Sequence, residues 1–176
     1  MSIAIVVTAI GFIVACIVSD VRARRIPNLL TLSGLIAGVA LNVATGGGSG
    51  LLHSVVGLFV AVALLLPAFA GGGIGGGDVK MMAALGALLG ARLVVVGLLC
   101  GMIAGGVVML VHLWWIGRTR EKLQATLHMA VSALRLGSLA PLKAAANDPA
   151  AVTLPYSVPL GLGVLLTISL GLMAGM

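Results

Sequence analysis

Long runs without charged residues dominate the sequence and predict membrane-spanning helices. Asp, Glu, Lys and Arg are absent from residues 1–19, 26–77, 93–117 and 149–176. A helix needs about 20 mostly apolar residues to cross a bilayer. Two glycine-rich stretches, 46–50 and 71–77, divide the longest run and are expected to end helices. The pattern predicts an all-α bundle of about six transmembrane helices, at residues 2–19, 26–44, 51–70, 79–90, 93–116 and 154–173.

The positive charges are distributed unevenly around these expected spans. If the N-terminus lies outside, nine of the ten Lys and Arg residues fall on the inner side and only Arg92 on the outer side. Such an excess inside is typical of multi-pass membrane proteins. The nine inner residues are Arg22, Arg24, Arg25, Lys80, Arg118, Arg120, Lys122, Arg135 and Lys143. This distribution predicts a multi-pass membrane protein with its N-terminus outside.

Residues 117–150 form the one sizeable polar segment, which we expect to be a cytoplasmic loop. Apolar residues recur in it at helical spacing, at Leu123, Leu127, Val131 and Leu134. Basic residues occupy other positions, as in a helix that lies on an anionic membrane surface. A plain cytoplasmic connector is the alternative.

Composition excludes several classes of protein. Of 176 residues, 61% are hydrophobic and 8% charged, and the mean hydropathy is +1.27. A soluble domain has about 25% charged residues. The chain therefore has too few polar residues for a soluble enzyme or a nucleic-acid-binding protein, and we expect one transmembrane domain over residues 1–176. No oligomeric state follows from the sequence.

The two cysteines, Cys16 and Cys100, lie in apolar runs and form no Cys-x-x-Cys pair. A zinc module and a disulfide framework are therefore not expected, and neither is another metal or cofactor. The residues before Cys16 are similar to a lipoprotein cleavage site. However, a secretory signal places positive charges before its apolar stretch, and here they follow it.

Four acidic residues are present, and two of them are candidates for chemistry. Glu121 and Asp148 fall in the polar segment, where a solvated surface position is expected. Asp20 and Asp78 each fall at the inner end of an expected span, where an acid is costly and points to function. Two adjacent carboxylates share a proton, so that one can activate a water molecule while the other donates a proton. In the simpler interpretation, Asp20 balances nearby arginines and Asp78 caps a helix.

The residues around Asp78 favour the chemical interpretation. Six of the seven residues before it, 71–77, are glycine. Non-helical backbone at membrane depth is tolerated where it lines a cavity or is buried in protein. A phosphate-binding loop is not expected, because its Gly-Lys-Ser/Thr ending is replaced here by Asp78-Val79-Lys80.

Three motifs resemble those of the type IV prepilin peptidases. Gly75-Gly76-Gly77-Asp78, followed by Lys80, is a Gly-x-Gly-Asp-x-Lys motif. The segment Asp20-Val21-Arg22-Ala23-Arg24-Arg25-Ile26-Pro27-Asn28 resembles the first-aspartate segment of that family. The segment Leu154-Pro155-Tyr156-Ser157-Val158-Pro159 resembles its late Pro-Tyr segment.

This resemblance implies an intramembrane aspartic endopeptidase of the bacterial inner membrane that removes the leader of prepilins at the cytoplasmic face, without a cofactor. It assigns catalysis to Asp20 and Asp78, and supporting positions to Gly75, Gly77 and Lys80. Alternatively, the side chain of Lys80 has no part in the site and simply extends to the membrane–water interface. The expected partners are the prepilin and membrane lipids. Positions that could contact either of them are Arg22, Arg24, Arg25, Asn28, Pro155 and Tyr156.

The sequence departs from the resemblance in one respect. Members that also N-methylate the new terminus carry an N-terminal region with cysteine pairs, and this sequence starts at the first expected span without them. We therefore expect peptidase activity without methyltransferase activity. The short chain resembles the peptidases of tight-adherence (Flp-type) pilus systems.

Two other classes of protein remain as alternatives. Glycine-broken spans also form ion sites in small transporters, where Asp20 and Asp78 would relay protons. A non-catalytic assembly scaffold would tolerate replacement of both aspartates. A serine intramembrane protease is disfavoured, because the sequence has no Gly-x-Ser-x-Gly motif.

Overall fold

The computed structural model describes residues 2–115, 131 and 156–173, and in these ranges it contains helices and no strand. The helices are α1 (Ile3–Ala23), α2 (Asn28–Ala70), α3 (Gly76–Trp115) and α6 (Ser157–Met173). The prediction of an all-α fold is confirmed for this part of the chain. Three helices are long and apolar enough to cross a membrane, namely α1, α2 and the part of α3 up to Val111, while α6 is a shorter apolar helix.

The expectation of six separate spans is not supported. The described part of the chain has four helices, because α2 takes in most of the expected span 26–44 and all of 51–70, and α3 takes in 79–90 and residues 93–115. Within α2 and α3 the backbone leaves helical geometry at one residue each, Gly47 and Gly90, so each pair of expected spans forms one kinked helix. The expected amphipathic segment within 117–150 lies outside the described residues, apart from Val131.

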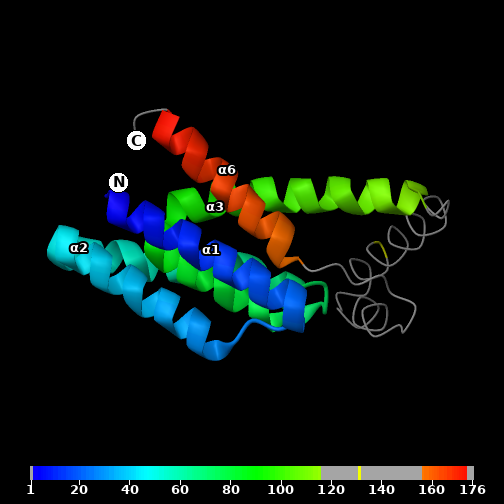
Figure 1. The fold of residues 1–176 in the computed structure, drawn as a ribbon. Helices are drawn as coiled ribbons and strands as arrows, with labels where there is room; N and C mark the ends of the chain where they lie inside the picture. The colour runs from blue at the N-terminus through cyan, green and yellow to red at the C-terminus, as the bar shows by residue number, and fades with distance from the viewer. Residues whose placement is uncertain (1, 116–130, 132–155, 174–176) are drawn as a thin grey trace.

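Helix α2 is sharply kinked at Gly47. A straight helix of its 43 residues would be about 65 Å long, roughly twice the hydrocarbon core of a bilayer. Gly47 has φ 58°, a left-handed conformation that favours glycine. A Cβ atom on Gly50 would overlap the backbone carbonyl of Asn42, although a straight helix would separate these residues by about 12 Å. The two arms of α2 therefore fold back on each other, as Figure 1 shows.

Helix α3 has a similar kink at Gly90, where φ is 79°. The ring of His53, from the second arm of α2, lies where a Cβ atom of residue 90 would be. Any other residue at position 90 would therefore combine backbone strain with a steric clash.

Small residues bring α3 and α6 into close contact. Gly97, Gly101 and Gly105 recur every fourth position on α3 and face Pro159, Leu160 and Val164 of α6. Gly163 of α6 in turn lies against the backbone of Gly101. Such contacts are typical of membrane helices, which associate through close backbone packing rather than through the hydrophobic effect.

The polar ends of several helices meet at one end of the bundle. The end of α1, its connection to α2, the glycine-rich segment 71–75 and the start of α6 lie there in Figure 1. Pro27 occupies the position just before α2. The expected glycine break after Ala70 is confirmed, and it ends where α3 begins at Gly76.

Candidate active site

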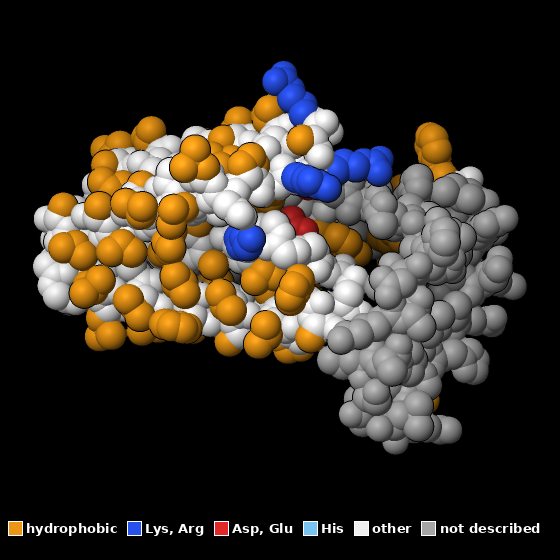
Figure 2. Space-filling view, turned by 90° about the horizontal axis from the view of Figure 1, so that it is seen from below, with side chains coloured by type: hydrophobic (Ala, Val, Ile, Leu, Met, Phe, Trp, Pro, Cys, Tyr) orange, Lys and Arg blue, Asp and Glu red, His pale blue; other side chains and the backbone are white. Residues whose placement is uncertain are grey.

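A polar cavity of about 580 Å³ opens at this end of the bundle. Asp20 from α1 and Asp78 from α3 both line it, and the charge of Asp20 is close enough to act on Asp78. In Figure 2 an acidic side chain is visible between Lys and Arg side chains, beside a largely hydrophobic surface. The lining residues are Asp20, Ala23, Arg24, Arg25, Ile26, Pro27, Asn28, Gly75, Gly76, Gly77, Asp78 and Lys80.

Asp78 is held in the first turn of α3. It is the third residue of the helix rather than its N-cap, which corrects the capping position considered from the sequence. Its side chain turns back and accepts a hydrogen bond from the backbone N–H of Gly75, as in a capping box. Only 8% of the residue is exposed, so the carboxylate is largely shielded from solvent while it still borders the cavity.

Asp20 lies in the last turn of α1 and is fixed from two sides. Its backbone carbonyl accepts the N–H of Arg24, whose left-handed conformation (φ 49°) ends the helix. Its carboxylate atom Oδ2 accepts a hydrogen bond of 2.5 Å from the hydroxyl of Ser157, at the start of α6. Ser157 is fully buried, so this bond connects α1 to α6 in a shielded position.

Spacing in the sequence assigned no role to Ser157, although it lies beside Tyr156 in the segment that resembles the Pro-Tyr motif. Its position as a hydroxyl at the beginning of an apolar helix was the available signal. Without the packing of α6, nothing in the sequence identifies Asp20 as its partner.

The motif glycines contribute mainly by their small size. Gly75 and Gly77 have no positive φ angle, whereas Gly72, in the break before them, has φ 77°. A Cβ atom on Gly75 would lie 3.4 Å from Oδ2 of Asp78, and one on Gly77 would lie 3.5 Å from Ile26. A methyl group at Gly75 would therefore make ordinary contact with the carboxylate of Asp78, and one at Gly77 would make ordinary contact with Ile26.

The positive side chains around the cavity differ in their contacts. Lys80 donates a hydrogen bond of 2.9 Å to Oδ1 of Asn28, which links α3 to α2. Arg24 and Arg25 line the cavity, whereas Arg22 is exposed on the last turn of α1 and is not part of the lining. Tyr156 is 40% exposed and is not part of the lining either. Pro155 lies outside the described residues.

Together these features define a helical membrane protein that brings two carboxylates from separate helices into one polar cavity. Such a pair can deprotonate a water molecule and supply a proton in the same reaction.

A protein-family model, described as the type IV leader peptidase family, matches residues 7–110. The chain belongs to this family, which identifies it as a peptidase. The match includes Asp20, Asp78 and Lys80, and it ends before α6 and Ser157. Comparison with curated proteins and with solved structures found no match.

Proposed function

We propose that this protein is an aspartic endopeptidase that removes the leader of type IV prepilins, with Asp20 and Asp78 as its catalytic residues. The observation that carries the proposal is that both carboxylates line one cavity in a member of the leader peptidase family. The other two acidic residues of the sequence, Glu121 and Asp148, fall in the polar segment 117–150.

In the proposed reaction, one water molecule and one proton lie between Asp20 and Asp78. The ionised carboxylate takes a proton from the water as its oxygen attacks the scissile carbonyl. The protonated carboxyl gives its proton to the carbonyl oxygen. Collapse of the tetrahedral intermediate breaks the C–N bond, and the proton taken from the water passes to the leaving nitrogen. No cofactor takes part.

The surrounding residues have supporting roles in this proposal. Gly75 and Gly77 line the cavity without side chains, so an extended substrate backbone can approach closely there. Ser157 holds one oxygen of Asp20, which fixes the direction of the other. Arg24, Arg25 and Asn28 border the place where the polar leader would lie. Arg22, Pro155 and Tyr156 are proposed as outer contacts for substrate or lipid headgroups.

The proposal includes a location. The excess of Lys and Arg on the same side as Asp20 and Asp78 favours an active site at the cytoplasmic face of the inner membrane, with the N-terminus outside. We further propose Flp-type prepilins as substrates, one peptidase domain over residues 1–176, and no methyl transfer. The chain has no cysteine pair of the kind that the resemblance associates with methyl transfer.

The test is co-expression with Flp-type prepilins, with leader removal read as a gel shift. The wild-type chain is compared with Asp20→Asn and Asp78→Asn. Asp148→Asn makes the same chemical change at the remaining aspartate and serves as the matched control. Membrane levels of all variants are measured on the same samples. We expect wild type and Asp148→Asn to cleave and both other variants to be inactive.

Cleavage by Asp20→Asn or Asp78→Asn would refute the two-aspartate mechanism. If wild type cleaves none of the prepilins, the transporter and the assembly scaffold become the better descriptions. Mass spectrometry of the mature pilin tests the methylation proposal separately, because a methylated N-terminus would add about 14 Da to it.

A further inference from the structure

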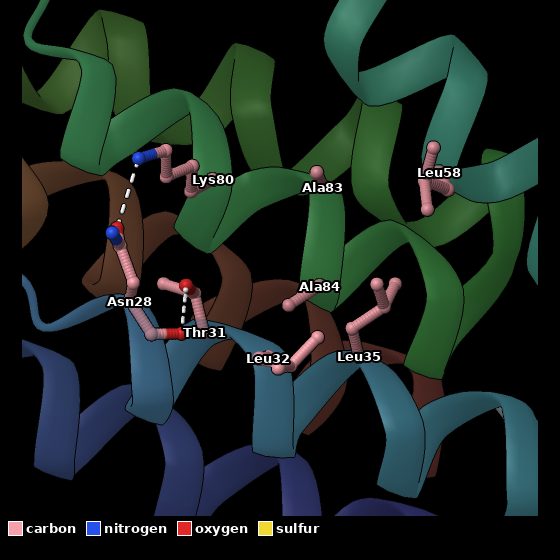
Figure 3. A pocket seen from close by; sticks show the side chains of 8 residues that line it. All are labelled: Asn28, Thr31, Leu32, Leu35, Leu58, Lys80, Ala83 and Ala84. Carbon is pink, nitrogen blue, oxygen red and sulfur yellow. Dashed lines mark hydrogen bonds between the residues drawn. The ribbon is translucent and has the colours of Figure 1, made fainter.

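A second, apolar groove lies between α2 and α3 and adjoins the polar cavity (Figure 3). Its volume is about 300 Å³. On one side, the small side chains of two alanines of α3 make room for the groove. Leucines of α2 form the opposite side. The lining residues are Asn28, Thr31, Leu32, Leu35, Leu58, Lys80, Ala83 and Ala84.

The polar side chains that line this groove already have hydrogen-bond partners within the protein. The hydroxyl of Thr31 donates to the backbone carbonyl of Asn28 at 2.9 Å, so its hydrogen bond is made within α2. The side chains of Asn28 and Lys80 are bonded to each other, as the dashed line in Figure 3 shows. An occupant can therefore be apolar without leaving buried polar groups unsatisfied.

The groove continues directly from the cavity that holds the two carboxylates. Asn28 and Lys80 line both spaces, so they form the boundary between them. From Asn28 the groove follows α2 to Leu35, a distance of about 10 Å along the helix axis. This direction leads away from the charged end of the bundle and along the apolar helices. A chain cleaved between Asp20 and Asp78 can enter the groove on its membrane side.

We propose that this groove is a substrate subsite that binds large apolar side chains from the hydrophobic segment of the prepilin. The inference rests on the proposed function, because it needs a peptide bond held between Asp20 and Asp78. A volume of about 300 Å³ is at the small end of ligand pockets, so the groove accepts side chains rather than a whole helix. Leu32, which is 51% exposed, lies on the open side.

The first test fills the groove. Ala83 is partly exposed and borders the space, so Ala83→Leu narrows it while disturbing the core little. Ala40→Leu adds the same side chain at an exposed position of α2 outside the groove. The purified full chain is assayed in lipid nanodiscs with an Flp-type prepilin. We expect Ala83→Leu to raise KM roughly tenfold with kcat within a factor of two, and Ala40→Leu to match wild type. An unchanged KM, or a fall in kcat alone, would overturn the subsite.

The second test detects occupancy without catalysis. A photo-reactive benzoylphenylalanine replaces Leu32 in the inactive Asp78→Asn chain, and in a matched chain it replaces Ser33, which is exposed but does not line the groove. We expect crosslinks from position 32 to the hydrophobic segment of the prepilin, at least fivefold more than from position 33. Equal crosslinking, or crosslinks only to lipid, would overturn the proposal.

The two proposals fail in distinguishable ways. If wild type does not cleave and no crosslink forms, both are wrong. If wild type cleaves and Asp78→Asn does not, while Ala83→Leu and the crosslinks are without effect, only the subsite is wrong.

Discussion

The bundle has a polar cavity at each end, and the two cavities use their polar groups differently. The one that begins at Ser2 measures about 360 Å³ and is lined in part by Asn42, His53 and Arg92, and among the described residues no carboxylate lines it. The amide of Asn42 donates to the backbone carbonyls of Ala87 and Leu88 at 3.0 and 3.1 Å, which joins α2 to α3. At this end, the amide of Asn42 therefore serves to hold two helices together.

At the other end, the two carboxylates border open space and are held at their edges by Gly75 and Ser157. Burying polar groups is costly unless they are bonded, so both cavities must satisfy them. The bonds of Asn42 show that a polar side chain at a cavity of this bundle can serve to join two helices. What separates the two ends is a pair of acids with oxygen atoms that remain available.

The largest effect is expected when both acids are changed together. Asp20→Asn and Asp78→Asn should each lower kcat by roughly 10³-fold, within the range for loss of a general acid or base. Because the two act as a unit, the double variant should be only slightly slower than either single one. Single-turnover cleavage of a prepilin measures this, and effects that multiply would show that the carboxylates act independently.

Removing the partner of Asp20 should have the next largest effect. Ser157→Ala should lower kcat roughly 10- to 100-fold with KM unchanged, because a hydrogen bond to a charged group contributes about 1.5–3 kcal/mol. Ser157→Thr keeps the hydroxyl and should recover part of the rate. Thr167→Val removes another buried hydroxyl of α6, which donates to the backbone carbonyl of Gly163, and should leave kcat unchanged. Equal losses from Ser157→Ala and Thr167→Val would mean that Ser157 serves only packing.

At the opposite end, the same kind of change should affect stability instead of rate. Asn42→Ala removes the bonds to Ala87 and Leu88 and should lower the free energy of unfolding by about 1–3 kcal/mol. Cleavage per folded molecule should stay within a factor of two. Thermal unfolding in detergent, measured beside a cleavage assay, separates the two quantities. If Asn42→Ala lowered kcat without lowering the free energy of unfolding, the cavity at the Ser2 end would contribute to the reaction, and the proposed difference between the two cavities would be wrong.

A smaller effect is expected at the boundary between the cavity and the groove. Lys80→Met and Asn28→Ala each break the same hydrogen bond and should raise KM about threefold, because an exposed bond contributes about 1 kcal/mol or less. The double variant should be no worse than the single ones. Additive effects in this cycle would show that each side chain contacts the substrate separately.

The smallest effect is expected for the charge at the Ser2 end. Arg92 is exposed and lines only the cavity without carboxylates, so Arg92→Gln should cleave prepilin at the wild-type rate. The cleavage assay already described is sufficient, with membrane levels as the control. A tenfold loss would give that end of the bundle a part in the reaction.

The sequence predicted the helical class and the pair of acids, because both follow from local signals. Charged residues mark the ends of apolar runs, and Asp20 and Asp78 lie at two such ends on the same expected side. Helices that end together bring their terminal residues together. The cavity lined by both acids agrees with this expectation, while their catalytic role stays a prediction.

The described residues form four helices where six spans were expected, because glycine content does not distinguish a kink from a break. Residues 46–50 and 71–75 are both glycine-rich, yet α2 continues through the first with one non-helical residue and ends before the second. At the first, Gly50 packs on the backbone of Asn42, and at the second, Gly75 caps α3 and lines the cavity. These tertiary contacts decide between the two outcomes, and composition does not contain them.

The bond between Asp20 and Ser157 joins residues 137 positions apart, which has a consequence for the order of synthesis. A ribosome adding about 5–20 residues per second makes Ser157 roughly 7–27 seconds after Asp20. Asp78 is also made in that interval, so both carboxylates are inserted before the hydroxyl that fixes one of them. The cavity therefore reaches its final arrangement only when the last helix docks. A nascent chain carries both acids before this alignment exists, so newly made protein gains the alignment only once α6 has been made and has docked.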